Sequence, residues 1–256
     1  PKANHQIIAT INPDFGQVES DELIVNYSAV ETLRTDKRPF FTENQSLFDV
    51  QGPNNLKLVN TRRIGANAKL DTNKVHDIKA AGKYIYNGAN INAGVLFAQE
   101  DDAVGNDGKK FTSARWYSSF ERVSLGQLVN YVSNPLDDRT SLVFNQDLRF
   151  QASDEINLFA NLIYSENEQA ATTTRGRGAT LKTSYVPVRH WQNNLEWTYL
   201  DEDFDINDLG YQERNNISTL AVNSQYDDYA FSADSPILRT RLYGQYQSRR
   251  SALGLN

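Results

Sequence analysis

The sequence contains neither cysteine nor methionine. The lack of cysteine excludes disulfides and thiolate metal sites, and it favours an exported protein. The lack of methionine indicates a processed chain or an internal fragment, and no signal peptide is visible. No segment reaches the roughly 18 consecutive apolar residues of a membrane helix, so helical membrane spans are excluded. The strands of a transmembrane barrel need only about 9–11 residues of alternating character, so a barrel is not excluded.

Apolar residues are scarce as well, at 39% of the chain, but aromatic residues make up 11%, including 13 Tyr and 12 Phe. Disordered chains are poor in aromatics, so this composition indicates a folded protein with a sheet whose second face meets water. The net charge of -6 argues against nucleic acid as a partner.

Residues 141–165 carry the clearest pattern in the sequence. In the first arm an apolar row alternates with a mainly polar one: Leu142, Phe144, Gln146, Leu148 and Phe150 against Val143, Asn145, Asp147 and Arg149. After a polar break the apolar row resumes with Ile156, Leu158, Ala160, Leu162 and Tyr164. Because residues two apart share a face only in a strand, this pattern predicts an antiparallel hairpin. Such a hairpin fits either a soluble sandwich or an outer-membrane barrel.

The chain divides into three parts. Residues 1–15 predict a first strand. Residues 16–59 predict a short helix over 16–34, capped by Ser20, and then an ordered, plug-like loop rich in phenylalanine. Residues 60–256 predict about 12 strands in all, beginning with polar ones at 61–71 and 75–86. The long polar loops are expected at 165–178 and 201–216.

Alternating short and long connections favour a membrane barrel, because outer-membrane barrels have short periplasmic turns and longer external loops. We therefore expect an all-β protein, an antiparallel up-and-down transmembrane β-barrel, complete or partial, with an N-terminal plug-like segment. A soluble exported β-sandwich is the alternative, since alternation is not specific to membranes. Its inner faces would be denser in Val, Ile, Leu and Phe.

Four motifs follow one another along the chain: NPDFGQVESD (12–21), KRPFF (37–41), TRRIG (61–65) and FDINDLG (204–210). This ordered set resembles a group of bacterial surface proteins known only as a domain of unknown function. In that group a β-sandwich similar to family-9 carbohydrate-binding modules usually precedes a predicted outer-membrane barrel. The resemblance implies a bacterial outer-membrane location. Members are longer and the sandwich is absent here, so we expect the chain to cover the first part of a barrel. The group has no established activity, so no functional residue is carried over.

Two sets of residues are candidates for function. The first would line a pore and set its charge preference: Arg62, Arg63, Asn145, Asp147, Arg149, Asn157 and Asn161. The alternative is that these charges pair with one another inside a plugged lumen. The second set would form a plug or gate: Lys37, Arg38, Phe40 and Phe41. The alternative is an inward loop that simply fills the barrel.

Signals for metal binding and catalysis are weak. Asp201, Asp203 and Asp205 resemble the start of an EF-hand, but Ile206 and Gln212 replace the Gly and Glu that its sixth and twelfth positions need. A looser Ca²⁺ site is the only cofactor hypothesis, and a solvated acidic loop is the alternative. The sequence has no phosphate loop and no G-x-S-x-G, and its three His lack metal spacing. We expect no enzyme.

The sequence therefore predicts a passive pore or solute-binding channel in a bacterial outer membrane. Its partners would be lipid or lipopolysaccharide and a carbohydrate-like solute. The alternative is a surface binding or assembly protein that uses the barrel as an anchor.

Overall fold

The structure is a computed structural model that describes residues 4–13, 36–50, 52, 56–65, 67–68, 71–102, 107–229, 231 and 235–251. The helix expected over 16–34 lies outside these residues. Helical structure in the described part is confined to α1 (Pro39–Thr42) and the 3-10 turns η1 (Gln45–Leu47), η2 (Thr61–Arg63) and η3 (Pro135–Asp137). No helix among the described residues is long and apolar enough to cross a membrane.

Eleven strands form one antiparallel sheet, in which β1 pairs with β4 and every later strand pairs with its neighbours in sequence. A separate two-stranded sheet joins β2 (Asn67–Ala68) and β3 (Asp71–Val75). The strands of the large sheet are β1 (Asn4–Ile11), β4 (Ile78–Asn87), β5 (Ile91–Glu100), β6 (Lys110–Phe120), β7 (Val123–Asn134), β8 (Arg139–Gln151), β9 (Ile156–Gln169), β10 (Thr172–Val188), β11 (Trp191–Leu200), β12 (Ile217–Asp228) and β13 (Thr240–Arg250).

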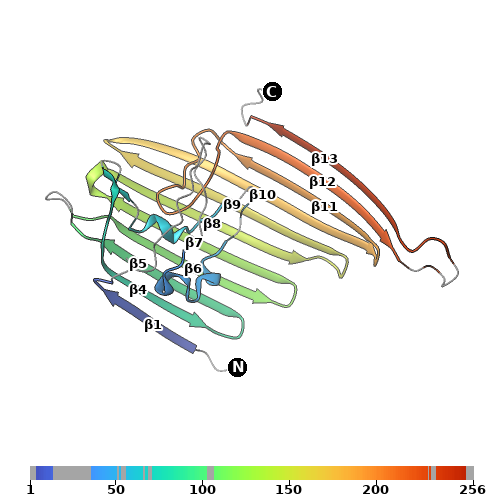
Figure 1. Cartoon of the computed structure of the whole chain (residues 1–256), viewed down its shortest axis with the longest axis horizontal. Coiled ribbons are helices and arrows are strands. Elements are labelled where there is room, and N and C mark those ends of the chain that lie inside the picture. Colours follow the sequence, from blue (N-terminus) through green and yellow to red (C-terminus); the bar gives the residue numbers. More distant parts are fainter. Residues whose placement is uncertain are drawn as a thin grey trace.

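The predicted all-β, antiparallel, up-and-down architecture is confirmed. The sheet is open, because β1 and β13 form its two edges and do not pair with each other in the described structure. Figure 1 shows one broad, curved sheet with β1 at one edge and β13 at the other. The structure thus contains the up-and-down sheet without closing it into a barrel.

The two ends of the sheet differ in their connections. At the turn end the strands join through residues 88–90, 121–122, 152–155 and 189–190, and only the connection 229–239 is long. At the loop end the strands are separated in sequence by the longer intervals 12–77, 101–109 and 201–216 and by short turns at 135–138 and 170–171. The expected difference between short and long connections is therefore present, with three exceptions: the long connection 229–239 at the turn end and the short turns 135–138 and 170–171 at the loop end.

Two sequence predictions about local structure are wrong. Residues 165–178 are not a loop, because β9 and β10 continue to a two-residue turn at Ala170 and Ala171. Both alanines have positive φ, 48° and 64°, which this tight turn requires and which Gly or Asn would have signalled. Residues 61–71 are not one strand either. The amides of Arg63 and Ile64 bond back to the carbonyls of Asn60 and Thr61 and form η2.

The described residues of segment 36–65 and the segment 201–216, together called the cover, lie over one face of the sheet (Figure 1). We call this the covered face and the other the open face. Phe41, Phe48, Leu58, Phe204 and Leu209 of the cover are at most 3% exposed. They pack against apolar side chains of the covered face: Ala81, Ile85, Leu96, Ala98, Phe111, Leu128, Val132, Val143 and Ile163. The core thus lies between the sheet and a layer of loops, not between two sheets.

The open face is apolar and carries no charge over the middle of five strands. Five of its large side chains, Val95, Trp116, Val129, Phe144 and Leu162, are 38–60% exposed. No Asp, Glu, Lys or Arg points to this side within 91–97 of β5, 112–120 of β6, 123–131 of β7, 142–150 of β8 and 156–164 of β9. The polar pair Gln127 and Gln146 satisfies itself, since Nε2 of Gln127 donates to Oε1 of Gln146 at 2.8 Å.

Candidate functional site: the covered polar face

The KRPFF motif forms a buried cluster of hydrogen bonds with one ion pair around Arg38, which we call the Arg38 knot. The Arg38 side chain is 3% exposed and forms an ion pair with Asp36 at 2.8 Å. Its remaining donors reach the carbonyls of Ile64 at 2.8 Å and Thr61 at 2.7 Å, and its guanidinium lies 4.3 Å from the Phe41 ring centroid. Arg38 thus ties the first motif of the cover to the TRRIG motif, and its charge is fully compensated.

Asp36 is the acidic partner of this knot. Burial acts to raise its pKa, but hydrogen bonds from Arg38, the Arg38 charge and a 2.7 Å bond from the Thr61 hydroxyl outweigh that effect. The Asp36 pKa therefore lies below its usual value. The folded state binds the proton less readily than the unfolded state, so the knot is stabilised by the ionised carboxylate.

Three polar side chains of the sheet hold the cover in place. Lys83 of β4 donates to the carbonyl of Phe40 at 2.7 Å and to that of Glu43. Glu100 of β5 accepts from the Gly65 amide at 2.9 Å, and Asn130 of β7 donates to the Leu58 carbonyl at 2.7 Å. All three sheet residues are buried. Because each bonds to backbone, the attachment depends on the path of the cover more than on its side chains.

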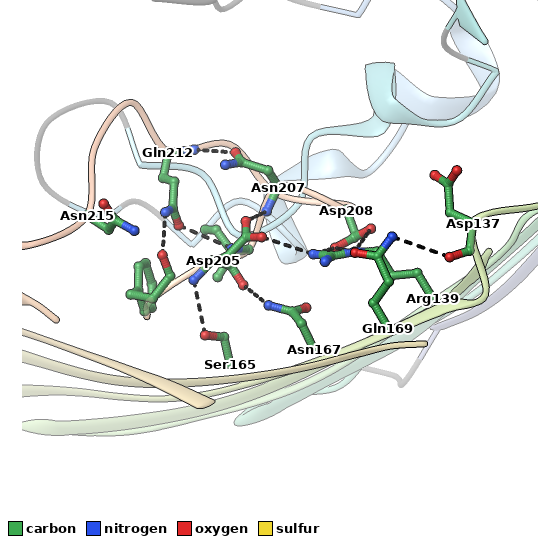
Figure 2. Close-up of polar contacts among 12 residues, drawn as sticks. Asp137, Arg139, Ser165, Asn167, Gln169, Asp205, Asn207, Asp208, Gln212 and Asn215 are labelled. Atoms are coloured by element: carbon green, nitrogen blue, oxygen red, sulfur yellow. Dashed lines mark hydrogen bonds and ion pairs between the residues drawn. The ribbon is translucent and has the colours of Figure 1, made fainter. Parts of the chain in front are cut away.

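The loop 201–216 is anchored to β8 and β9 through the FDINDLG motif, as Figure 2 shows. Arg139 bonds to both oxygens of Asp208 and pairs with Asp205 at 2.9 Å. Asn167 donates to the Asp205 carbonyl at 3.0 Å, and the Asp205 amide donates to the Ser165 hydroxyl at 3.2 Å. The motif is therefore a docking element for this loop.

The two segments of the cover are also joined to each other. Lys57 and Tyr211 exchange backbone hydrogen bonds of 3.0 and 2.8 Å, and the Asn60 amide donates to the Leu209 carbonyl at 2.7 Å. Arg63 donates to the Gly210 carbonyl at 3.2 Å. The segments are about 150 residues apart in sequence but form one layer.

An ion pair lies within the covered face itself. Arg115 of β6 and Asp147 of β8 form two hydrogen bonds of 2.8 and 3.0 Å, and both side chains are buried. The strand between them, β7, contributes Gly126, where an added Cβ would lie 2.5 Å from an Asp147 oxygen. Glycine at this position therefore lets the pair form across an intervening strand. Asn145 adds a 3.1 Å bond to Asp147.

Towards the turn end the covered face is bare and forms a groove of about 710 Å³. The covered-face side chains that line it come from six strands, and all but Phe159 and Ala221 are polar: Ser124, Arg149, Asn157, Phe159, Lys182, Ser184, Asn194, Glu196, Ala221 and Asn223. Lys182 and Glu196 pair at 3.3 Å, and Asn194 donates to Asn223 at 3.0 Å. A volume of this size suits a small-molecule site.

The structure separates the predicted pore-lining residues into three groups. Asn145, Asp147 and Asn161 are on the covered face but lie beneath the cover. Arg149 and Asn157 line the groove. Arg62 and Arg63 belong to η2 of the cover and not to the sheet, so their placement on a strand is wrong.

The predicted plug residues lie in the cover. Arg38, Phe40 and Phe41 are buried, and Lys37 is exposed. Phe40 and Phe41 contact edge to face with ring centroids 5.0 Å apart. These placements agree with a plug or gate and equally with an inward loop that only fills the barrel.

The calcium hypothesis gains no support from the acidic loop. Asp201 accepts from the Arg177 amide at 2.7 Å, and Asp205 is paired with Arg139. In the part of the chain that the structure describes, no group of three or more His, Cys, Asp or Glu side chains is close enough to hold a metal ion.

Sequence reasoning missed several residues that the site depends on: Asp36, Lys83, Glu100, Arg115, Asn130, Arg139, Lys182 and Glu196. One signal was available for Arg115, which is the only charge between Phe111 and Phe120 and lies next to Trp116. A charge at the centre of a strand needs a partner, which directs attention to Asp147. The other residues act through contacts that no local pattern encodes.

Comparison with known proteins adds a family but no activity. The family model described as "Domain of unknown function (DUF5916)" matches residues 4–94 and 121–252. Those ranges include the KRPFF, TRRIG and FDINDLG segments. No curated protein matches the sequence.

Proposed function

The chain belongs to this family of unknown function, and from its two contrasting faces we propose that it is part of the wall of an outer-membrane β-barrel. In this proposal the open face meets lipid and the covered face meets the lumen. The cover acts as a plug at the loop end, and the groove binds solute at the turn end. The mechanism is passive: a carbohydrate-like solute binds in the groove, and its passage depends on the position of the plug.

The segregation of charge between the faces carries the proposal. The charged side chains Lys83, Arg115, Asp147, Lys182 and Glu196 point to the covered face, whereas Glu166, Arg175 and Arg177 point to the open face only near the loop end of β9 and β10. The open face presents exposed aromatic and aliphatic side chains instead. A contiguous apolar surface of this extent marks a protein or membrane contact, and outward apolar and inward polar rows are the pattern of membrane barrels.

The length of the uncharged stretch supports the membrane over a protein partner. Residues 123–131 of β7 span roughly 30 Å along the strand at about 3.3 Å per residue. Tilted by about 35–45°, such a stretch covers roughly 21–25 Å of bilayer, close to the apolar band of about 25 Å in known barrels. Trp116, Trp191 and Trp197 on the same face suit this setting.

Reconstitution into phospholipid vesicles tests the proposal. We expect the purified protein to float with the vesicles and to migrate differently on gels before and after heating. Liposome swelling with small sugars would then measure passage. Arg38→Ala, which removes the centre of the knot and loosens the plug, should increase the swelling rate. Protein that stays in solution without detergent would refute the membrane location, and inserted protein that gives no swelling with either form would refute the channel.

A surface anchor is the second candidate, and the interlocked cover favours it. Segments 36–65 and 201–216 share a buried core and at least four hydrogen bonds, so they form a rigid layer at the loop end. An anchor predicts membrane insertion without passage, even after Arg38→Ala. It also predicts that replacing exposed residues of 201–216 abolishes partner binding and leaves insertion unchanged.

A further inference from the structure

The groove at the turn end differs from the rest of the covered face, because a strand contributes a charge to it, Arg149, that has no counter-charge among the described residues. Arg149 forms no ion pair or side-chain hydrogen bond among the described residues, and its guanidinium lies 5.6 Å from the Phe159 ring centroid. Asp147, the acid two residues away on the same strand, is committed to Arg115. Lys182 is committed to Glu196. Glu121 and Arg122 also line the groove but belong to the turn between β6 and β7, so Arg149 is the unpaired charge that the strands of the covered face contribute.

The other groove side chains are hydrogen-bonding groups that both donate and accept. Asn157 is exposed, and Ser184, Asn194 and Asn223 are half-buried along the same wall. Carboxamides and hydroxyls of this kind match the alternating donors and acceptors of sugar hydroxyls. Phe159 and Ala221 are the apolar side chains that the covered face contributes to the groove.

Arg149 also lies at a junction. It lines a second hollow of about 300 Å³ at the edge of the cover, together with Leu47 and Asp49 of the cover and Arg115 of the sheet. No other residue lines both spaces. A ligand held by Arg149 is therefore adjacent to the cover.

We propose that the groove binds an acidic saccharide, with the carboxylate of a uronic acid on Arg149 and the hydroxyls of the chain on Asn157, Asn194 and Asn223. The inference rests on the proposed function, in which this face lines a lumen. Phe159 restricts the orientation of the Arg149 guanidinium, whose fork matches a carboxylate in two parallel hydrogen bonds. The carboxamides contribute contacts that acidic and neutral sugars share.

Calorimetry with the vesicle-inserted full chain tests this, using trigalacturonate and the neutral maltotriose as probes. Trigalacturonate should bind, and Arg149→Gln should weaken its binding at least tenfold, because a charge-assisted pair becomes a neutral one. Asn223→Ala should weaken the binding of both probes by similar factors, each smaller than the effect of Arg149→Gln on trigalacturonate. Arg175→Gln is the matched control, since Arg175 pairs with Glu166 outside the groove and should change neither.

The outcomes separate this inference from the proposed function. Inserted protein that binds trigalacturonate no better than maltotriose, or whose Arg149→Gln variant binds it unchanged, overturns the acidic-saccharide site and leaves the membrane proposal standing. Protein that binds trigalacturonate through Arg149 but does not float with vesicles retains the site and refutes the membrane wall.

Discussion

Val129→Arg distinguishes a lipid-facing sheet from a water-facing one. Val129 points to the open face at the middle of β7, is 38% exposed, and pairs with Ala114 and Phe144, neither of which offers a counter-charge. In water an arginine at such a surface position changes the free energy of unfolding by about 0.5 kcal/mol or less. On the lipid face of a barrel it costs about 2–4 kcal/mol at the midplane and less towards the interfaces.

The position of Val129 sets the expected size of the effect. It lies two residues from Gln127, the centre of the uncharged stretch 123–131, or roughly 7 Å along the strand. We therefore expect about 2 kcal/mol, which lowers the folding equilibrium constant about 30-fold. Urea unfolding in phospholipid vesicles, followed by tryptophan fluorescence, measures this change.

Ser133→Arg is the control for that experiment. Ser133 lies on the same strand and the same face but at the loop end, opposite Lys110 and Thr140. An arginine near the interface costs about 0–1 kcal/mol. If Val129→Arg and Ser133→Arg destabilise equally, or if neither changes stability, the assignment of the open face to lipid is wrong.

Three further predictions concern the covered face. Asp147→Asn should lower the free energy of unfolding by about 3–5 kcal/mol, because it leaves the buried Arg115 without a counter-charge; urea unfolding checks this. Gly176→Val should displace the loop 201–216, because a side chain there meets the Phe204 backbone; limited proteolysis within the loop should become faster. Asp36→Asn should remove one acid-dependent loss of stability from the pH titration of the folded protein. The low pKa of Asp36 stabilises the knot above about pH 4, and this stability is lost as the pH falls through the folded-state pKa. Tryptophan fluorescence against pH follows it.

Each of these has a matched control or a contrary outcome. Lys182→Ala breaks a half-exposed ion pair and should have little effect on stability, in contrast to Asp147→Asn. Gly244→Ala adds a Cβ that meets no atom within 4 Å, so the loop should keep its resistance to protease. If Asp36→Asn titrates like the wild type, the acid-dependent loss of stability belongs to another carboxylate.

The faces of the sheet were predictable from sequence because side-chain alternation is a local property. Leu142, Phe144 and Phe150 were placed on one side of the 141–165 hairpin and Asn145 and Asp147 on the other, and the structure has them so. The same reasoning failed at 165–178. Its polar composition indicates a loop, but the cross-strand pairing of β9 with β10 decides the conformation.

The contacts of the covered face were not predictable, because they join residues that are distant in sequence. The Arg115–Asp147 pair depends on strand order, on register and on a glycine in the strand between them. The Arg38 knot depends on the return of the TRRIG segment, 26 residues away at Ile64. Sequence motifs marked these segments as related without indicating what they contact.

The open edges of the sheet have an energetic consequence for how such a wall enters a bilayer. β13 runs over Thr240–Arg250 and pairs only with β12 among the described strands, so its outer backbone groups have no partner in the sheet. In hydrocarbon each unpaired backbone group costs several kcal/mol. Stepwise insertion of this sheet, strand by strand, would therefore pass through states with an exposed hydrogen-bonding row. Insertion is favourable only if both edges, β1 and β13, acquire pairing partners as they leave water.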